Sequence, residues 1–329
     1  MLGATGRAPP RLRKAAVAPT VGRAGRAGLR RRRRGWGDGG GGQSSGEGSC
    51  RRVIQPAGGM VRVVVWTAPR CVSTALEKAL AGAPPRVDVM HEPLSKHYYF
   101  GPQRVSERYA GQPPDTASDA TPDGVFERIL AAGDGERGAH VVVKDMAYYL
   151  DGYDVRAAVR CLRAGDVRHA FLVRSPRATV PSLYKASLDT ERTGWDYFDA
   201  REVGMESLSK LYDAVVEEEA SEPVVLDSDD LIDDPTGAMR AFCGAVGLPF
   251  DATRMLAWEE GPLPGWDTWG GWHDDAIHST GFRPRAERGA WLRECKPTGL
   301  GVAHDAVARE AAEAAMPAFQ KLHVKRLRW

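Results

Sequence analysis

The sequence predicts an α/β protein in which about five parallel strands form a sheet that is covered by helices. Short apolar runs rich in valine recur along the chain, and they lack the strict alternation of a strand that faces water on one side. Longer stretches with helical character separate most of these runs, which is the order of strand–helix–strand crossovers. The expected strands are residues 61–66, 87–90, 141–143, 170–173 and 224–226. No internal repeat at solenoid periods is present, so a layered α/β domain is the natural interpretation.

Two expected helices have the clearest apolar spacing of three or four residues, and we predict that both cover the sheet. Their apolar positions are Leu208, Leu211, Tyr212 and Val215 in the first, and Ala303, Val307, Ala311 and Ala315 in the second.

Composition divides the chain into a basic extension, residues 1–59, and one domain, residues 60–329. Residues 1–36 contain 11 Arg or Lys and no Asp or Glu, and Gly39–Gly42 opens a flexible polar linker. Such a segment lacks the apolar volume to offset the entropy of ordering, so we expect it to be disordered. The formal net charge of +2 therefore conceals a basic arm and a more acidic remainder.

The Arg-rich, acid-poor arm favours an organelle transit peptide, for a plastid or a mitochondrion. A nucleic-acid-binding tail and translated sequence upstream of a true start at Met60 are the alternatives. No stretch has the roughly 18 to 20 apolar residues of a membrane span, and no signal-peptide core is present. We expect a soluble intracellular protein, cytoplasmic if the arm does not target it. The five cysteines are odd in number and form no C-x-x-C pair, so we expect no disulfide.

The first chemical motif is the turn that follows the first strand, residues 67–76. A strand–loop–helix turn directs backbone N–H groups and the positive end of the helix dipole at one point, which creates an anion site. Ser73 and Thr74 add hydroxyl donors, and Arg70 adds a fixed charge. An ordinary helix cap with a solvated Arg70 is the alternative. No G-x-x-x-x-G-K-[ST] sequence occurs, which argues against a Mg-nucleoside triphosphate enzyme.

The second motif, residues 171–182, leaves another apolar strand at Arg174 and reaches Ser182 on the following helix. An arginine can donate to two phosphate oxygens at once, and it suits such a site better than lysine. A salt bridge for Arg174 and an exposed hydroxyl for Ser182 are the alternatives.

Together these motifs resemble the sulfotransferases that use 3′-phosphoadenosine-5′-phosphosulfate (PAPS). Pro69-Arg70-x-x-Ser73-Thr74 is similar to the family's 5′-phosphosulfate loop, while Arg174 and Ser182 match its 3′-phosphate signature. The resemblance implies a three-layer, P-loop NTPase-like domain. Cys71 and Val72 stand where the family usually has Gly or Ser, and we expect them to contribute backbone groups to the loop.

Further similarity extends the resemblance to about four fifths of the chain. Residues 224–251 look like the family's strand, acidic turn, Pro-started helix and Gly-Leu-Pro exit, with Pro235 opening the helix. Residues 91–94, 144–146 and 279–282 are most similar to a sulfotransferase-like group labelled branched-chain aminotransferase-like. No pyridoxal-phosphate site is recognisable, so we discount aminotransfer.

The resemblance implies transfer of a sulfuryl group from PAPS, as co-substrate, to a hydroxyl or amine of a small-molecule or carbohydrate acceptor. Positioning and electrostatics should dominate such a reaction. Arg70 is the candidate for neutralising charge on the leaving oxygen. Glu92, after the second strand, is the candidate general base, because ligands bind at the carboxyl ends of parallel strands. Its alternative role is to accept hydrogen bonds from loop amides.

Three other residues are rival or secondary candidates near the base. His91 and His97 could replace Glu92, although a lone histidine beside a strand end is commonly structural. Lys144 could reach the sulfate, or it could form a local ion pair with Asp145. No histidine follows Lys144 as in cytosolic members of the family, which favours Glu92.

The segment 258–282 contains four tryptophans among Gly and Pro, and it could form a lid over the acceptor. Core filling is the alternative. His273 and His278 are too far apart for one helical face, so we expect no metal site. Arg283, Arg285 and Arg288 are loosely similar to the family's basic 3′-phosphate loop, and only Arg283 is included in the expected site.

Two other functions remain open. One is a module that binds PAPS, or its product 3′-phosphoadenosine-5′-phosphate (PAP), without transferase activity. The other is a basic-tailed polyanion-binding protein, whose binding should weaken steeply with salt. Nucleic acid is not an expected partner of the domain, and the sequence does not reveal the oligomeric state or the acceptor.

Overall fold

The structure is a computed structural model, and it describes residues 59–133, 139–266, 269–283 and 294–329. The basic extension therefore lies outside the described residues except for its last position, and Arg285 and Arg288 also lie outside them.

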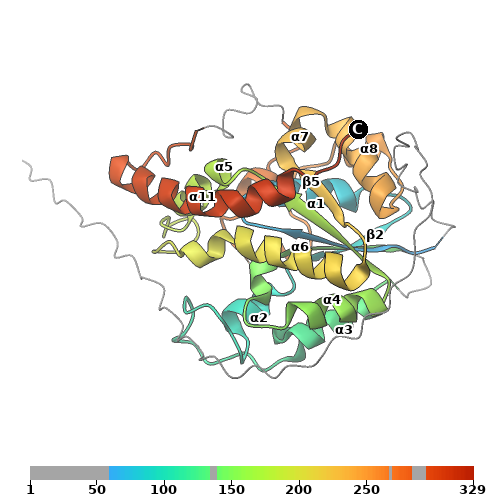
Figure 1. The fold of residues 1–329 in the computed structure, drawn as a ribbon, viewed down its shortest axis with the longest axis horizontal. Coiled ribbons are helices and arrows are strands. Elements are labelled where there is room, and N and C mark those ends of the chain that lie inside the picture. Colours follow the sequence, from blue (N-terminus) through green and yellow to red (C-terminus); the bar gives the residue numbers. More distant parts are fainter. Residues whose placement is uncertain (1–58, 134–138, 267–268, 284–293) are drawn as a thin grey trace, which may run out of the picture. The chain divides into compact units, whose positions relative to one another are not determined.

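A five-stranded parallel sheet has the strand order β2-β3-β1-β4-β5. The sheet forms the centre of the domain, with helices around it (Figure 1). This confirms the predicted fold class. The strands are β1 Arg62–Thr67, β2 Val87–His91, β3 His140–Met146, β4 Val167–Val173 and β5 Val224–Asp227.

The valine run of β1 becomes the central strand because its side chains are buried on both faces. Val63, Val64 and Val65 are at most 1% exposed, and β1 pairs with both β3 and β4. Arg62, which interrupts the run, donates to the backbone carbonyls of Leu130 and Ala132. A charged residue is thus accommodated at the start of a buried strand by hydrogen bonds to carbonyl groups.

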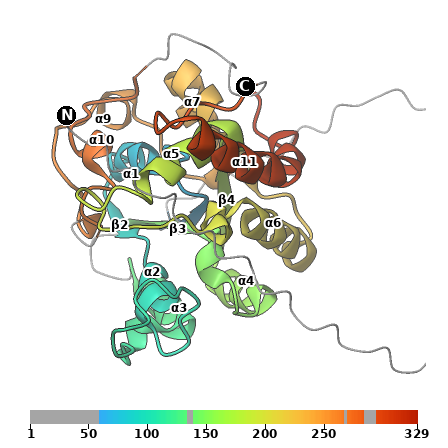
Figure 2. The same cartoon turned by 90° about the vertical axis from the view of Figure 1, so that its left-hand side faces the viewer.

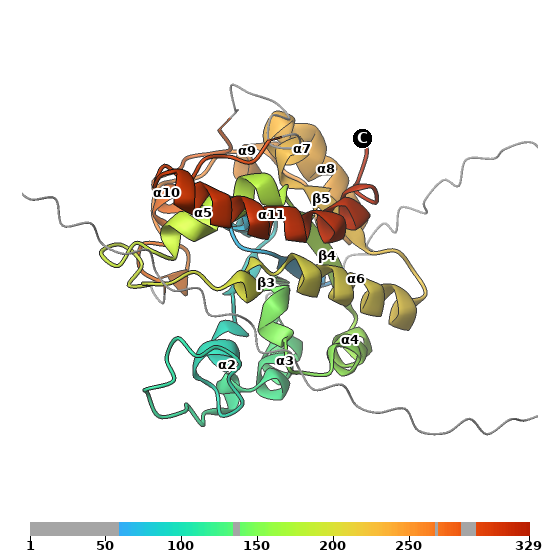
Figure 3. The ribbon, with the colours of Figure 1, turned by 60° about the vertical axis from the view of Figure 1, so that its left-hand side comes forward.

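Helices cover both faces of the sheet: α1 packs against β2 and β3, while α4 and α6 pack against β4. Figure 2 shows α1 and α4 on opposite sides of the sheet. The C-terminal helix α11 packs against α5 and α6 (Figure 3). The α-helices are α1 Ser73–Ala81, α2 Ser95–Phe100, α3 Pro122–Ala131, α4 Val155–Ala164, α5 Pro176–Ala186, α6 Met205–Glu219, α7 Ser228–Asp233, α8 Pro235–Val246, α9 Ala252–Met255, α10 Asp274–Ile277 and α11 Val302–His323. Short 3₁₀ turns occupy Ser118–Ala120, Ala147–Leu150 and Ala200–Val203.

The predicted start of α8 is present, because Pro235 occupies its first turn and the Asp234 carboxylate accepts a hydrogen bond from the Gly237 N–H at 3.0 Å. The predicted apolar face of α6 is also buried. Among the described residues, no helix is both long and apolar enough to cross a membrane.

The predicted C-terminal helix α11 is present and packs against β4 and β5, but its buried side differs from the expected apolar positions. Of the four expected positions only Ala315 is buried. The buried stripe instead passes through Ala308, Ala312, Met316 and Phe319. Alanine recurs on both sides of this helix, so its spacing alone did not distinguish the two faces, and the large side chains of Met316 and Phe319 decide the orientation.

The order of the strands determines where a ligand can bind. The chain adds β2 and β3 on one side of β1 and then β4 and β5 on the other. In open parallel sheets, ligands bind outside the carboxyl ends of the strands where the strand order reverses. The loops after β1, β2, β3 and β4 all open at that edge.

Candidate active site

The loop after β1 is a backbone turn shaped for close approach by a ligand. Arg70 and Val72 have φ values of 65° and 64°, in the left-handed region that non-glycine residues rarely adopt. Each costs on the order of 1–3 kcal/mol and persists only where the surrounding structure enforces it. Val72 is the N-cap of α1, and no side chain in the described part of the chain caps this helix. Its first N–H groups are therefore suited to an anion.

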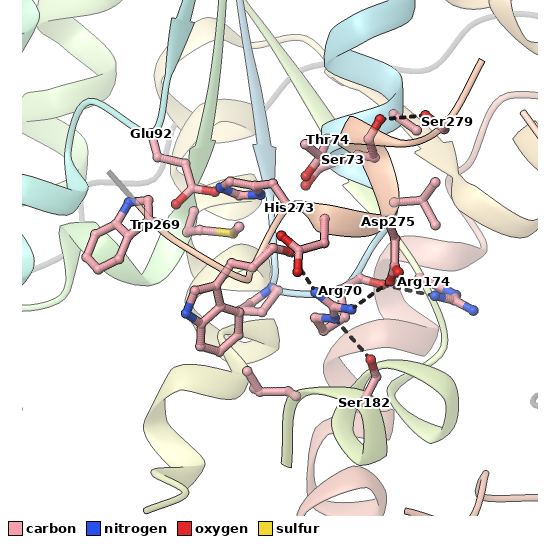
Figure 4. A pocket seen from close by; sticks show the side chains of 18 of the residues that line it. Arg70, Ser73, Thr74, Glu92, Arg174, Ser182, Trp269, His273, Asp275 and Ser279 are labelled. Atoms are coloured by element: carbon pink, nitrogen blue, oxygen red, sulfur yellow. Dashed lines mark hydrogen bonds and ion pairs between the residues drawn. The ribbon is translucent and has the colours of Figure 1, made fainter. Parts of the chain in front are cut away.

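The Arg70 side chain crosses the cavity rather than turning back to its own loop (Figure 4). Its Nε donates to Ser182 Oγ at 3.0 Å and its Nη1 donates to the Trp272 carbonyl at 3.2 Å. The Asp275 carboxylate lies 3.7 Å from its Nη2. Burial lowers the pKa of Arg70, and Asp275 opposes that shift. The guanidinium, expected beside the 5′ phosphate, thus connects the β1 loop to the residue expected at the 3′ phosphate.

Arg174 leaves the end of β4 and braces the same loop. Its Nη1 donates to the Arg70 carbonyl at 3.0 Å, while its Nε lies 3.5 Å from the Asp229 carboxylate. The side chain is 14% exposed and lines the cavity. A strand-end salt bridge, the alternative role for this residue, is therefore present together with access to the cavity.

The cavity at this edge of the sheet has a volume of about 520 Å³. It brings together all but one of the expected site residues, although they come from four separate parts of the chain. Those that line it are Arg70, Val72, Ser73, Thr74, Glu92, Arg174, Ser182 and Arg283.

Cys71 is the exception, because its side chain is fully buried in the core. Burial raises the pKa of its thiol to about 11, so the thiol stays protonated at neutral pH. Its carbonyl accepts a hydrogen bond from Ser228 Oγ. Cys71 therefore holds the turn on the side of the core, while Val72 lines the cavity.

Glu92 follows β2 with a φ of 42° and is held by its backbone as well as by its side chain. Its N–H donates to the Lys144 carbonyl at 2.8 Å, and its own carbonyl accepts from Ser95 N and Oγ at 3.0 and 2.6 Å. The carboxylate accepts from Lys144 Nζ at Oε1 and from Tyr149 OH at Oε2, the latter at 2.9 Å. Burial alone would raise the pKa of Glu92, but the Lys144 charge and nearby imidazoles lower it to about 2.

Lys144 therefore pairs with Glu92 and not with Asp145, as the alternation of side chains along β3 requires. Asp145 accepts instead from the backbone N–H groups of Leu94 and Met146. Burial raises the pKa of Asp145 well above its ordinary value. Lys144 does not line the cavity, so it contacts the Glu92 carboxylate from the protein interior.

The two rival histidines have different surroundings. His97 is buried in α2 and does not line the cavity. His91 Nδ1 donates to the Glu77 carboxylate at 2.8 Å, and its Nε2 lies 3.0 Å from His273 Nε2. Burial and the Lys144 charge lower the pKa of His273 to about 3. His273 lines the cavity beside Glu92 (Figure 4).

Aromatic side chains line the cavity on the side of Glu92, and sequence reasoning found only part of this wall. Trp269 and Trp272 come from the segment expected to form a lid, and they line the cavity, whereas Trp266 is buried and Trp258 packs on Phe282. The missed members are Tyr99, Tyr148, Tyr149 and Trp195. The pair Tyr148-Tyr149, just beyond the end of β3, was the available signal.

The parallel sheet and the cavity at its carboxyl edge define the class of open α/β proteins whose ligand site forms from loops that follow the strands. Within this class, a sequence profile of the sulfotransferase domain family matches residues 61–293. The chain belongs to this family.

Two curated relatives from Arabidopsis thaliana carry the aminotransferase-like label. Branched-chain-amino-acid aminotransferase-like protein 2 is 27% identical over 229 residues, which are 66% of this chain and 35% of that protein. Branched-chain-amino-acid aminotransferase-like protein 1 is 31% identical over 116 residues, 35% of this chain and 19% of that protein. The chain thus spans about a third or less of the length of each of these relatives.

Among solved structures, the sulfotransferase domain of the Synechococcus PCC 7002 olefin synthase is similar, with 15% identity and a TM-score of 0.44. The match covers 79% of this chain and 96% of that domain.

Proposed function

We propose that this protein is a sulfotransferase that moves a sulfuryl group from PAPS to a hydroxyl or amine of a small acceptor. The observation that carries the proposal is the cavity in which Arg70, Arg174 and the uncapped start of α1 converge opposite Glu92. Family membership gives the reaction class, and the positions of these residues support the choice of donor.

The residues around the β1 loop suit a nucleotide with two phosphate groups. Ser73 and Thr74, at the start of α1, offer hydroxyl and backbone donors for the 5′ phosphate. Arg174 and Ser182 offer donors for the 3′ phosphate, and Arg283 lines the same cavity. The Asp275 carboxylate, 3.7 Å from Arg70 Nη2, supports the choice of this guanidinium as a partner for an anion.

PAPS, when bound, would supply the sulfuryl group: the acceptor bonds to sulfur as the S–O bond to the 5′ phosphate breaks, and the phosphate leaves with the electron pair. Arg70 would neutralise the charge that develops on the leaving oxygen. Glu92 would accept the acceptor's proton at Oε1 or Oε2 once Lys144 or Tyr149 yields that oxygen. The aromatic wall beside Glu92 would position the acceptor.

The non-catalytic PAP- or PAPS-binding module remains the second candidate, and one observation favours it. Glu92 is engaged by Lys144 and Tyr149, and its pKa of about 2 makes it a weak base. Binding of the nucleotide is common to both candidates, so binding is the first property to measure.

The test is a calorimetric titration of the full chain with PAP, in parallel with Arg174→Ala. We expect saturable one-to-one binding that weakens at least tenfold in the variant, because hydrogen bonds to charged groups contribute about 1.5–3 kcal/mol. Arg177→Ala is the matched control, since Arg177 lies three positions further on and pairs with Glu313 at 2.6 Å. Absence of binding, or equal losses in both variants, would contradict the donor site.

A further inference from the structure

We propose that His91, Glu92 and His273 bind one divalent transition-metal ion of the zinc class. This proposal departs from the expectation of no metal site, which considered His273 only with His278. The structure instead brings His273 against the end of β2. The three ligand atoms, two imidazole nitrogens and a carboxylate oxygen, lie within 4.8 Å of one another.

Two of the three spacings between these atoms are close to those of a tetrahedral site. Ligand atoms about 2.0–2.1 Å from a zinc ion lie roughly 3.3 Å from each other at the corners of a tetrahedron. His91 Nε2 is 3.0 Å from His273 Nε2 and 3.7 Å from Glu92 Oε1. Shifts of a few tenths of an ångström would therefore suffice to place both edges at the coordinated distance.

Hydrogen bonds from neighbouring residues already orient two of the proposed ligands, His91 and Glu92, toward the ion position. Glu77, whose side chain has no exposure, accepts the Nδ1–H of His91 at 2.8 Å, which leaves Nε2 as the nitrogen with the free lone pair. A carboxylate behind a histidine ligand is the usual device for orienting that ligand on a metal. Tyr149 OH holds Glu92 Oε2 at 2.9 Å, so that Oε1 faces the histidines.

The charges of the cluster also leave room for a cation. Glu77 and Glu92 are buried carboxylates, and Lys144 is the cation that contacts both. The carboxylates of Glu77 and Glu92 and the ammonium group of Lys144 together sum to one negative charge, which is costly inside a protein without compensation.

Lys144 is the competitor for the ion, because its Nζ contacts Glu92 Oε1. Binding must displace this contact or share the oxygen. Glu92 and His273 both line the cavity, so an open coordination position would face the space proposed for the acceptor. In that respect the inference rests on the proposed function: an ion that occupies Oε1 removes the proposed base, and zinc should inhibit sulfuryl transfer.

The test is calorimetric titration of the chelator-treated full chain with Zn²⁺, repeated with Co²⁺, whose visible absorption becomes intense in tetrahedral coordination. We expect one saturable site with a tetrahedral Co²⁺ spectrum, lost in His273→Ala. Glu77→Gln should weaken binding about 10- to 100-fold. His278→Ala is the matched control, because this histidine lies in the same segment but its side chain is 73% exposed and is not part of the cluster.

Thermal unfolding and PAP titration of each variant show whether it folds and keeps the nucleotide site. If PAP binds while zinc binding is absent or is unchanged in a folded His273→Ala variant, the metal proposal is wrong and the proposed function stands. If zinc binds as expected but PAP does not, the metal site stands and the nucleotide site fails. Binding lost equally in His273→Ala and His278→Ala would show non-specific zinc binding and overturn the proposal.

Discussion

Among single residues, Glu92 depends most on its ion pair with Lys144. The pair compensates the buried carboxylate charge, and it also lowers the pKa of Glu92. Lys144 and Glu92 side chains are 2% and 6% exposed, so removal of one partner leaves the other charge buried. Breaking a buried pair in this way typically costs about 3–5 kcal/mol, whereas replacing both partners can be neutral. Activity and stability must therefore be measured together.

Glu92→Gln should lower the turnover rate by roughly 10²- to 10⁴-fold, the usual contribution of a positioned general base. The same variant should unfold at lower denaturant concentration because the buried Lys144 then keeps only its longer contact with Glu77, at 3.9 Å. Glu92→Gln combined with Lys144→Met should recover stability but not activity. Activity recovered together with stability would show that Glu92 is structural and would favour the non-catalytic module.

Sequence reasoning found eight residues that line the cavity, because candidate phosphate-binding groups occur in short motifs next to strands. It placed Arg70 beside one phosphate, yet the side chain extends to Ser182, 112 positions away. It also did not anticipate that His91 meets His273, 182 positions away. Such contacts depend on how a loop returns to the sheet, which local spacing does not encode.

At the scale of elements, the short helix α10 places an anionic side chain at the cation proposed for phosphate. Asp275 is 83% exposed and lies 3.7 Å from Arg70, which also donates to Ser182 and to the Trp272 carbonyl. A phosphate group that binds Arg70 must compete with this carboxylate.

Asp275→Asn should therefore bind PAP about two- to fivefold more tightly, since exposed ion pairs contribute about 0.2–1 kcal/mol. Titration calorimetry measures the change. Asp274→Asn is the control, because the neighbouring carboxylate pairs with Arg192 at 2.9 Å. Equal effects of the two substitutions would indicate a general gain from removing negative charge, independent of the Arg70 contact.

The positions of elements with large apolar side chains could be predicted from the sequence. The buried face of a helix made largely of small residues could not. The valine-rich strands and the start of α8 agree with the prediction to within a few positions. The buried face of α11 does not agree with the prediction. Burial of an alanine contributes too little free energy to decide which side of the helix faces the core. The segment 258–282 contains no long periodic pattern, so the position of α10 could not be inferred from it.

For the whole domain, the valine-rich segments of the sequence predict strands that are buried on both faces and hence a parallel sheet. They do not predict the order of the strands in that sheet. Nothing in the local sequence indicates that β1 lies between β3 and β4. The resemblance to a known family implied a three-layer, P-loop NTPase-like domain, and no strand order was predicted. Buried polar contacts between neighbouring strands could not be predicted from the sequence either. One example is the hydrogen bond from Trp66 on β1 to His169 on β4.

His169 couples the stability of the sheet to pH. Trp66 Nε1 donates to its Nδ1 at 2.9 Å, and burial lowers the pKa of His169 to about 4. An unfolded histidine titrates near pH 6.5, so between about pH 6.5 and 4 the unfolded chain binds more protons than the native one. The stabilising contribution is thus complete above pH 6.5 and is lost as the pH falls.

We expect this group to remove up to about 3 kcal/mol of unfolding free energy by pH 4, reduced to the extent that Glu219, 3.5 Å from Nε2, stabilises the charged ring. Urea unfolding at several pH values measures the slope. His169→Asn keeps an acceptor for Trp66 without titrating, and its slope should be shallower. The exposed His278→Asn is the control, and a His169→Asn slope equal to the wild-type slope would contradict the assignment.

The contact between Arg70 and Asp275 has a consequence for the catalytic cycle. A carboxylate tethered beside the guanidinium is present at a constant local concentration, so it can replace a departing phosphate as soon as the nucleotide loosens. In sulfotransfer the spent nucleotide must leave before the next turnover. The same side chain that opposes nucleotide binding should therefore shorten the lifetime of the product complex, and Asp275→Asn would exchange tighter binding for slower release.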